Sequence, residues 1–251
     1  MKQYSFLAGI YDLLNCDFDY DSYAKFLDEE IRANEKTGSS LVLDLACGTG
    51  KITFKLRDLG YDMTGIDISE NMLSYAKDIC YDKGINDILW LNQDMTDFEL
   101  YGTVDACVCC LDSVNYLTKL SDVEKCFLLL HNYLIPDGVF IFDINTPYRF
   151  ENVYGNNAYI LENEGCLCAW QNEYNEKSKI CKFYLSIFEE NESGTYERYD
   201  EIQKEKCYSL KQICSLLKKC GFELLKVYGN LERKDASNTD EKWYFVARNI
   251  K

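Results

Sequence analysis

The chain has 251 residues, a net charge of −15 and an apolar fraction of 47%. The acidic charge and the lack of a basic run argue against a nucleic-acid partner and against binding to anionic membrane. No stretch approaches the ~20 apolar residues of a membrane span, and the acidic N-terminal segment is unlike a signal peptide. We therefore expect a cytoplasmic protein that binds neither nucleic acid nor membrane, in an oligomeric state that the sequence leaves open.

Residues 1–36 are predicted to be helical. Apolar side chains recur at helical spacing from Tyr4 to Leu14, and a second helical pattern runs from about Asp21 to Ala33. The simplest interpretation is that these helices pack against the edge of a sheet. A polar link, residues 37–40, leads into the first strand.

The segment from Leu41 to Leu45 is apolar except for Asp44, which is typical of a buried parallel strand. Gly48 and Gly50 then break the run, and a helical pattern follows. Glycines let the backbone turn tightly and approach a ligand closely, and the helix N-terminus beyond them presents free N–H groups. The segment is therefore predicted to be the first half of a nucleotide-binding unit.

Two ligand classes fit this turn. A dinucleotide site needs glycines in the spacing G-x-G-x-x-G, but the third position here is Thr53. Asp44, just before the turn, is a poor neighbour for pyrophosphate and a good one for a cation.

The second strand is predicted over residues 61–67 and ends in Asp67. A carboxylate at this strand tip is well placed to accept hydrogen bonds from ribose hydroxyls. Ser69 is the better N-cap for the next helix, which extends from about Glu70 to near Gly84. These features favour ribose binding by Asp67 over helix capping.

Two further strands are predicted, Ile88–Leu91 and Val104–Leu111. Asp94, after the third strand, taken alone would be a loop aspartate in a solvated turn. The loop 112–116 follows the fourth strand at its carboxyl end, where open α/β sheets bind ligands. We expect this loop to contact a substrate; the alternative is a polar loop that only precedes a helix.

Thirteen cysteines, an odd number, argue against a disulfide framework in a cytosolic chain. Cys107 and Cys110 form the only C-x-x-C, but on a strand their side chains point to opposite faces. The chain has one histidine, and no carboxylates cluster with it at ligand spacing. We therefore predict reduced thiols and no metal site.

Ser121 and Glu124 have the spacing of a capping box at the start of a helix. His131, near the end of that helix, is expected to be structural. Pro136–Gly138 is predicted to turn into the fifth strand, Val139–Ile144.

About 60 residues then intervene before the next helix, and they contain three strand patterns, at 166–174, 181–187 and 196–207. We predict an antiparallel meander that leaves the sheet at its ligand end and covers the active site. Asn145 and Trp170 are the candidate substrate-pocket residues, although Trp170 fits packing inside the meander equally well.

Several of these motifs together resemble the class I S-adenosylmethionine-dependent methyltransferases. Asp44-Leu-Ala-Cys-Gly-Thr-Gly50 looks like the first motif of that family, with Ala46 where many members have glycine. Asp67-Ile68-Ser69 with Met72 resembles the second motif, and Asp94-Met95 resembles the adenine-binding motif. Ile10-Tyr11-Asp12 is similar to the N-terminal segment of many small-molecule methyltransferases.

The resemblance implies S-adenosylmethionine as the cofactor and S-adenosylhomocysteine as the product. It places Asp44 near the ammonium of the methionine part, Ile68 and Met72 beside the adenine, and Asp94 at the adenine amino group. The cofactor-binding residues that it implies are Tyr11, Asp44, Ala46, Cys47, Gly48, Gly50, Asp67, Ile68, Met72, Asp94, Met95 and Leu111.

The resemblance also implies the architecture: an α/β fold with a Rossmann-like seven-stranded sheet flanked by helices, and a small antiparallel meander inserted after the fifth strand. Strands at 222–228 and 242–248 would form its closing hairpin. The expected domains are an N-terminal helical lid, a cofactor-binding domain in two segments and an inserted cap subdomain, over residues 1–36, 37–145 with 208–251, and 146–207.

The predicted reaction is methyl transfer to a nitrogen or oxygen of a small molecule. The inserted meander looks like that of small-molecule N-methyltransferases. Asp112, Asn115 and Tyr116 are expected to position the substrate, and no residue marks itself as an obligatory base. An NAD-dependent oxidoreductase and a non-catalytic binding module are the alternatives; the missing third glycine and Asp94-Met95 speak against the first.

Overall fold

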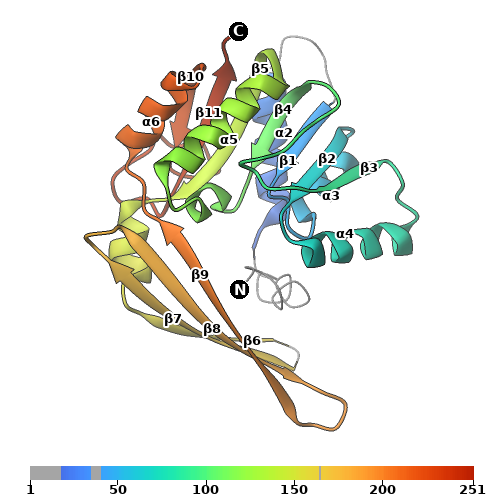
Figure 1. Cartoon of the computed structure of the whole chain (residues 1–251), viewed down its shortest axis with the longest axis vertical. Helices are drawn as coiled ribbons and strands as arrows, with labels where there is room; N and C mark the ends of the chain where they lie inside the picture. The colour runs from blue at the N-terminus through green and yellow to red at the C-terminus, as the bar shows by residue number, and fades with distance from the viewer. Residues whose placement is uncertain (1–17, 35–40, 164) are drawn as a thin grey trace.

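The structure is a computed structural model that describes residues 18–34, 41–163 and 165–251 (Figure 1). Tyr11 and the helix predicted before residue 18 lie outside the described residues. The described part of the chain forms a large mixed sheet with helices on both faces and, beyond one end of it, a second and smaller sheet.

The large sheet has seven strands in the order β10-β11-β5-β4-β1-β2-β3. Strands β1 to β5 are parallel to one another, and β11 runs antiparallel between β5 and β10. This is the predicted Rossmann-like arrangement with its closing hairpin. The bounds are β1 Leu41–Leu45, β2 Asp62–Asp67, β3 Ile88–Asn92, β4 Val104–Cys109, β5 Leu134–Asn145, β10 Phe222–Tyr228 and β11 Lys242–Asn249.

Two apolar clusters hold helices to opposite faces of this sheet. One contains buried residues of α2 and α3 together with one face of the central strands. The other contains residues of α5 and α6 and the opposite face. The helices are α2 Tyr20–Asn34, α3 Lys51–Asp58, α4 Glu70–Lys83, α5 Leu120–Tyr133 and α6 Leu210–Lys219. The cores therefore make a three-layer α/β/α sandwich.

The predicted helix boundaries are right where a side-chain cap is present. Ser69 caps α4 by accepting a hydrogen bond from the Met72 N–H, and Ser209 forms a complete capping box at α6. The capping box predicted at Ser121 is wrong. The Lys119 carbonyl already accepts hydrogen bonds from the helix, so α5 begins at Leu120 with no side-chain cap.

The fifth strand also differs from the prediction. It begins at Leu134, before the turn residues Pro136–Gly138, rather than at Val139. Its pairing with β4 shifts register between Val104 and Ala106, so those turn residues form an irregularity within the strand. A short bulge of this kind interrupts the ladder without ending it.

The smaller sheet is an antiparallel meander in the order β6-β7-β8-β9. It follows β5 and the turn Arg149–Tyr154, and in Figure 1 it extends away from the end of the large sheet. Its first strand was not predicted, because an edge strand with no fully buried residue carries no clear apolar pattern. The bounds are β6 Ala158–Asn163, β7 Cys166–Asn175, β8 Ile180–Glu190 and β9 Tyr196–Lys206.

The order of the large sheet determines where a ligand can bind. Strands β1, β2 and β3 follow one another toward one edge, whereas β4 and β5 lie on the other side of β1. The strand order therefore reverses between β1 and β4, and ligands of open α/β sheets bind beyond the carboxyl ends of the strands at such a point.

The cysteines that the structure describes are all free thiols. Cys107 lies in the core cluster of α5 and α6, and Cys110 in that of α2 and α3, as expected for opposite faces of a strand.

Candidate active site

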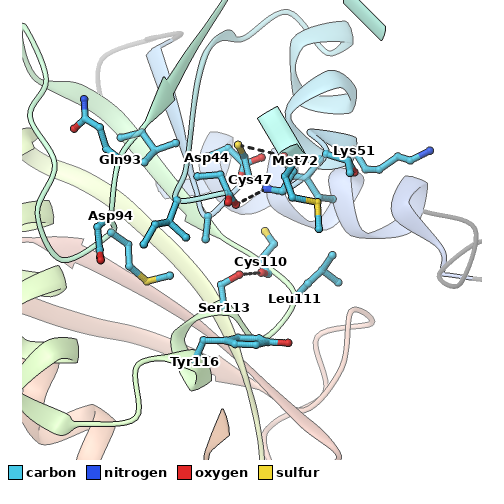
Figure 2. A pocket seen from close by; sticks show the side chains of 18 of the residues that line it. Asp44, Cys47, Lys51, Met72, Gln93, Asp94, Cys110, Leu111, Ser113 and Tyr116 are labelled. Carbon is cyan, nitrogen blue, oxygen red and sulfur yellow. Dashed lines mark hydrogen bonds between the residues drawn. The ribbon is translucent and has the colours of Figure 1, made fainter. Parts of the chain in front are cut away.

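A cavity of about 260 Å³ lies at the carboxyl ends of β1, β2 and β4. Figure 2 shows Gln93 and Asp94 on one side of it, Lys51 and Met72 on the other, and Tyr116 across its lower edge. Gly50 is not in the wall, and Tyr11 lies outside the described residues. The other expected cofactor residues all line it: Asp44, Ala46, Cys47, Gly48, Asp67, Ile68, Met72, Asp94, Met95 and Leu111.

Asp67 is held rigidly at the tip of β2. Its Oδ2 accepts a hydrogen bond of 2.8 Å from the Gly48 N–H, and its Oδ1 accepts one of 2.7 Å from the Ser69 N–H. Burial raises the pKa of Asp67 above its usual value, and these two hydrogen bonds oppose that shift. The carboxyl group therefore ties the glycine turn to the start of α4 while it faces the cavity.

Asp44 is the second carboxyl group in the cavity wall and is only 2% exposed. Its Oδ2 accepts a hydrogen bond of 2.6 Å from Thr53 Oγ1. Burial raises the pKa of Asp44 to about 7, the Asp67 charge adds to the rise, and the Thr53 hydrogen bond opposes it. A cation beside Asp44 would offset the cost of burying its charge.

The turn between β1 and α3 has the open space that a ligand needs. Gly48 has a φ of +56°, and a Cβ added there would meet no atom within 4 Å. A methyl group at this position would therefore project into free space beside the cavity. Gly50 has a φ of +80°, and a Cβ there would lie 2.5 Å from the Trp90 ring. Both positions favour glycine for different reasons: ligand space at the first and close packing at the second.

The same wall offers an apolar surface to a flat ring. Ile68 is 60% exposed although it is a large aliphatic residue, while Met72 beside it is buried. Asp94 is oriented by hydrogen bonds from the Thr96 N–H (2.7 Å) and Thr96 Oγ1 (2.8 Å) to its Oδ1. An apolar ledge beside an oriented carboxyl group suits an adenine that carries an amino group.

A second cavity, of about 440 Å³, lies between the smaller sheet and the ends of β4 and β11. Leu111 and Tyr116 line both cavities, so the two spaces meet at these residues. Tyr116 donates a hydrogen bond of 3.0 Å from its hydroxyl to Gln203 Oε1 on β9. This contact links the end of β4 to the inserted sheet.

Beneath the junction of the two cavities lies the fully buried carboxylate of Asp143 on β5. Its oxygens accept hydrogen bonds from the N–H groups of Leu111 (2.6 Å) and Asp112 (2.9 Å), from Lys242 Nζ (2.7 Å) and from the Tyr23 hydroxyl. Lys242 Nζ also lies 2.5 Å from Asp112 Oδ1. One buried lysine therefore joins two carboxylates.

This network determines the protonation state of its members. Burial alone would lower the pKa of Lys242, but the charges of Asp112 and Asp143 raise it well above its ordinary value. Burial raises the pKa of Asp112, whereas Lys242 and the more distant Arg149 lower it, and the net change is a decrease. Lys242 is thus a cation and Asp112 an anion at neutral pH.

The structure separates the expected substrate residues into two groups. Asp112, Tyr116 and Trp170 line the second cavity, and the Trp170 ring also packs against Phe183 in the inserted sheet. Asn115 lies in the wall of neither cavity. It is fully buried, it donates to the Lys206 carbonyl and it accepts from the Asn145 N–H.

Asn145 is also fully buried and absent from both cavity walls, but its Nδ2 donates a hydrogen bond of 2.8 Å to Glu205 Oε2. Glu205 does line the second cavity. The two asparagines therefore support the walls of the cavities rather than form them.

Sequence reasoning missed several charged residues of this region, namely Asp143, Arg149, Glu205 and Lys242. One of them, Asp143, left a signal in the sequence. Asp143 is the only charged side chain in the apolar stretch 139–145, as Asp44 is in β1. Glu205 belongs to a run of buried polar residues at alternate positions of β9, with Glu201 and Gln203. Such a polar inner face indicates a wet or functional cavity rather than a sheet core.

Comparison with known proteins supports the geometry. Residues 42–138 match the methyltransferase domain family. YqeM of Bacillus subtilis strain 168, which is named as a candidate methyltransferase, is 30% identical over 249 residues, covering 99% of this chain and 98% of that protein. The crystal structure of an S-adenosylmethionine-dependent methyltransferase from Clostridium acetobutylicum has a TM-score of 0.88 and 30% identity, over 99% of both chains.

A third relative has a known type of acceptor. An N,N-dimethyltransferase of Streptomyces venezuelae, named for the sugar nucleotide dTDP-3-amino-3,4,6-trideoxy-α-D-glucopyranose, is 30% identical over 152 residues. The match covers 59% of this chain and 60% of that protein.

The chain belongs to the S-adenosylmethionine-dependent methyltransferases. Its cofactor is S-adenosylmethionine, and the first cavity has two buried carboxyl groups, open space at Gly48 and an apolar ledge at Ile68. The NAD-dependent alternative is not supported. Thr53, at the position of the third glycine, instead hydrogen-bonds to Asp44.

Among the described residues, no group of three or more His, Cys, Asp or Glu side chains is arranged to hold a metal ion. The helices in the same part of the chain are too short or too polar to span a bilayer.

We predict that Asp67→Asn weakens S-adenosylmethionine binding by about 10- to 100-fold, because a charged acceptor of ribose hydrogen bonds becomes a neutral one. Calorimetric titration measures the change. Asp62→Asn, on the exposed start of the same strand, is the matched control. An unchanged dissociation constant in Asp67→Asn would refute the ribose role.

We predict that cofactor affinity falls as the pH drops below about 7, because protonation of Asp44 removes the charge that faces the cofactor ammonium. The limiting slope is tenfold per pH unit. Asp44→Asn should bind the cofactor weakly, and its affinity should not change with pH between about 5.5 and about 8.5. A flat profile for the wild type would contradict the prediction.

The raised pKa of Asp44 has the opposite effect on the stability of the ligand-free protein, which should fall as the pH rises. Folded Asp44 holds its proton more tightly than in the unfolded chain, so the ligand-free protein should lose stability as the pH rises from about 4 to about 7. Bound cofactor should reduce that loss.

We predict that Lys242→Met lowers the free energy of unfolding by about 3–5 kcal/mol, because two buried carboxylates lose their shared cation. Urea denaturation measures this change. Lys226→Met, at an exposed position of β10, should change stability by less than about 0.5 kcal/mol. Equal effects of the two substitutions would show that the network contributes little to stability.

Proposed function

We propose that this methyltransferase transfers a methyl group to a nitrogen or oxygen of a small-molecule acceptor held in the second cavity. One observation carries the proposal: the cofactor cavity and the second cavity meet at Leu111 and Tyr116. An acceptor in the second cavity would therefore lie next to the end of the cofactor cavity.

The domain assignment follows from this arrangement and is part of the proposal. Residues 37–145 and 208–251 would bind the cofactor, and residues 146–207 would form the cap that shapes the acceptor site. Residues 1–36 would act as the lid; within them, α2 contributes Tyr20 to the wall of the cofactor cavity. When separate segments bind the cofactor and the acceptor, the same cofactor site can be combined with sites for different acceptors.

Bound S-adenosylmethionine would supply an electrophilic methyl group on a sulfonium. The protein must then hold the acceptor atom about 3–3.5 Å from that methyl group and in line with its bond to sulfur. Asp67 and Asp44 would fix the cofactor, while Tyr116 and Asp112 would position the acceptor. The smaller sheet would exclude water, which competes for the methyl group and screens charges.

The relatives favour nitrogen over oxygen as the acceptor atom. The Streptomyces venezuelae relative is named for an amino-sugar nucleotide and for N,N-dimethylation. The second cavity also has aromatic walls and charged groups of both signs, which suits a polar molecule of modest size.

Two experiments test the proposed function. Calorimetric titration with S-adenosylmethionine and with NAD should give micromolar binding of the first and none of the second. Transfer of a labelled methyl group to a panel of small amines and alcohols should then identify acceptors. Cofactor binding without transfer to any member would favour the non-catalytic alternative.

We predict that Tyr116→Phe lowers turnover about tenfold while cofactor affinity changes less than twofold, because the lost hydroxyl bonds to Gln203 on the acceptor side. Steady-state kinetics and calorimetry on the same preparation measure the two effects. Tyr81→Phe, at an exposed position of α4, is the control. Parallel loss of both properties would mean that Tyr116 has a structural role.

A further inference from the structure

Glu205 is the most deeply buried acidic residue in the wall of the second cavity, with 2% of its surface exposed. It extends from β9 of the inserted sheet, and Asn145 Nδ2 on β5 fixes one oxygen of its carboxyl group by a hydrogen bond of 2.8 Å. Asp112 lies within hydrogen-bonding contact of the same carboxyl group. Two acidic side chains from distant parts of the chain therefore meet in the wall of one cavity.

The cations of this cavity are already paired. Lys242 lies between Asp112 and Asp143, and Arg149 pairs with Glu241 at 3.3 Å. Within the part of the chain that the structure describes, no cation forms an ion pair with Glu205, although Lys242 lies near enough to act on it. The ionisable groups that act on it are Asp112, Lys242, Tyr154 on the turn after β5, and Cys181 on β8. A ligand with a positive charge would therefore complete the charge balance of the cavity.

The same face of the inserted sheet also carries aromatic side chains. Trp170 packs edge-on against Phe183, with ring centroids 5.5 Å apart, and against Tyr154 at 5.8 Å. Trp170 Nε1 is buried without a hydrogen-bond partner among the described atoms. Aromatic faces attract cations, and a buried indole N–H without a partner indicates that a polar ligand atom belongs beside it. Both features fit an amine that carries an oxygen function.

We propose that the second cavity binds a primary or secondary amine as its ammonium ion and that Glu205 accepts the proton that must leave before methyl transfer. This inference rests on the proposed function and specifies its acceptor class. It assigns a catalytic role to a residue of the inserted sheet, and it makes Asn145 the positioning residue for the Glu205 carboxyl group.

The step balances as follows. One N–H bond of the ammonium breaks, its proton moves to a Glu205 carboxylate oxygen, and the electron pair stays on nitrogen. That pair forms the new N–CH3 bond while the C–S bond breaks with its pair on sulfur, which leaves a neutral thioether and a methylated ammonium. The proton on Glu205 then passes to solvent, so no further reactant is needed.

The environment of Glu205 also determines how binding is linked to protons. Burial raises the pKa of Glu205 well above its ordinary value and the Asp112 charge adds to this, while Asn145 and Lys242 oppose it. In the ligand-free protein Glu205 therefore holds its proton more tightly than a solvent-exposed glutamate does. An entering ammonium favours the carboxylate, so binding should release about one proton.

The first test measures this proton release by calorimetry at pH 7 in buffers of different ionisation enthalpy. The protein is saturated with S-adenosylhomocysteine, and the probes are benzylamine and benzyl alcohol. We expect benzylamine to bind at least tenfold more tightly than benzyl alcohol and to release about one proton. Equal binding of the two probes, or binding of benzylamine without proton release, would overturn the proposal.

Glu205→Gln is the decisive variant, because its amide oxygen can still accept the Asn145 hydrogen bond. It should abolish proton release and weaken benzylamine binding at least tenfold, with unchanged affinity for S-adenosylhomocysteine. Glu197→Gln, on the exposed part of β9, should behave as the wild type. If Glu205→Gln fails to fold, Glu205→Asp replaces it, and loss of proton release in a folded Glu205→Asp would count against the assignment.

The second test is the pH dependence of methyl transfer to benzylamine. Glu205→Gln should lower kcat/KM by about 100-fold at pH 7 and recover to within about tenfold near pH 9.5, where the free amine becomes abundant. If the wild type and Glu205→Gln have equal kcat/KM at pH 7, the catalytic role of Glu205 is refuted, whereas the proposed function is not. Proton-linked binding without transfer to any acceptor would instead count against the proposed function.

Discussion

The structure depends on the carboxylate of Asp143, which is buried in the middle of the protein and accepts hydrogen bonds from four groups. Burying an isolated charge costs several kcal/mol, and here the cost is offset by two backbone N–H groups, a tyrosine hydroxyl and Lys242. These partners come from α2, the end of β4 and the start of β11, so the charge can be satisfied only when these elements have assembled. The Asp143 network therefore couples folding of the large sheet to the geometry of the site.

The same network supports an unusual piece of backbone. Leu111 and Asp112 both have positive φ angles, +56° and +57°, which L-residues other than glycine adopt at a cost of about 1–2 kcal/mol each. Their N–H groups converge on Asp143 and turn the chain sharply after β4. That turn places Leu111 and Tyr116 between the two cavities, so the strain is located at the junction of these cavities.

Local sequence patterns located several of the residues that line the first cavity. The strand with Asp44, the glycine turn, Asp67 and the Ser69 cap lie within thirty residues of one another, and each has a local physical signature. The lining of the second cavity could not be predicted in this way. The hydrogen bond from Asn145 to Glu205 spans 60 residues, and the ion pair of Lys242 with Asp112 spans 130. Neither has a local signature, because both partners lie in ordinary strand or loop sequence.

The sequence by itself indicated the fold class and an inserted antiparallel sheet, and its resemblance to a known family implied the seven-stranded sheet and the cofactor. Apolar periodicity and turn residues form local patterns that repeat over many residues, so they can be recognised from the sequence alone. Only the tertiary structure decided that Asn115 and Asn145 lie behind the cavity walls, while Glu205, Arg149 and Lys242 line the second cavity. The role of a side chain in this region depends on which residues of other strands contact it in the folded protein. The distance between two residues along the chain does not predict such a contact.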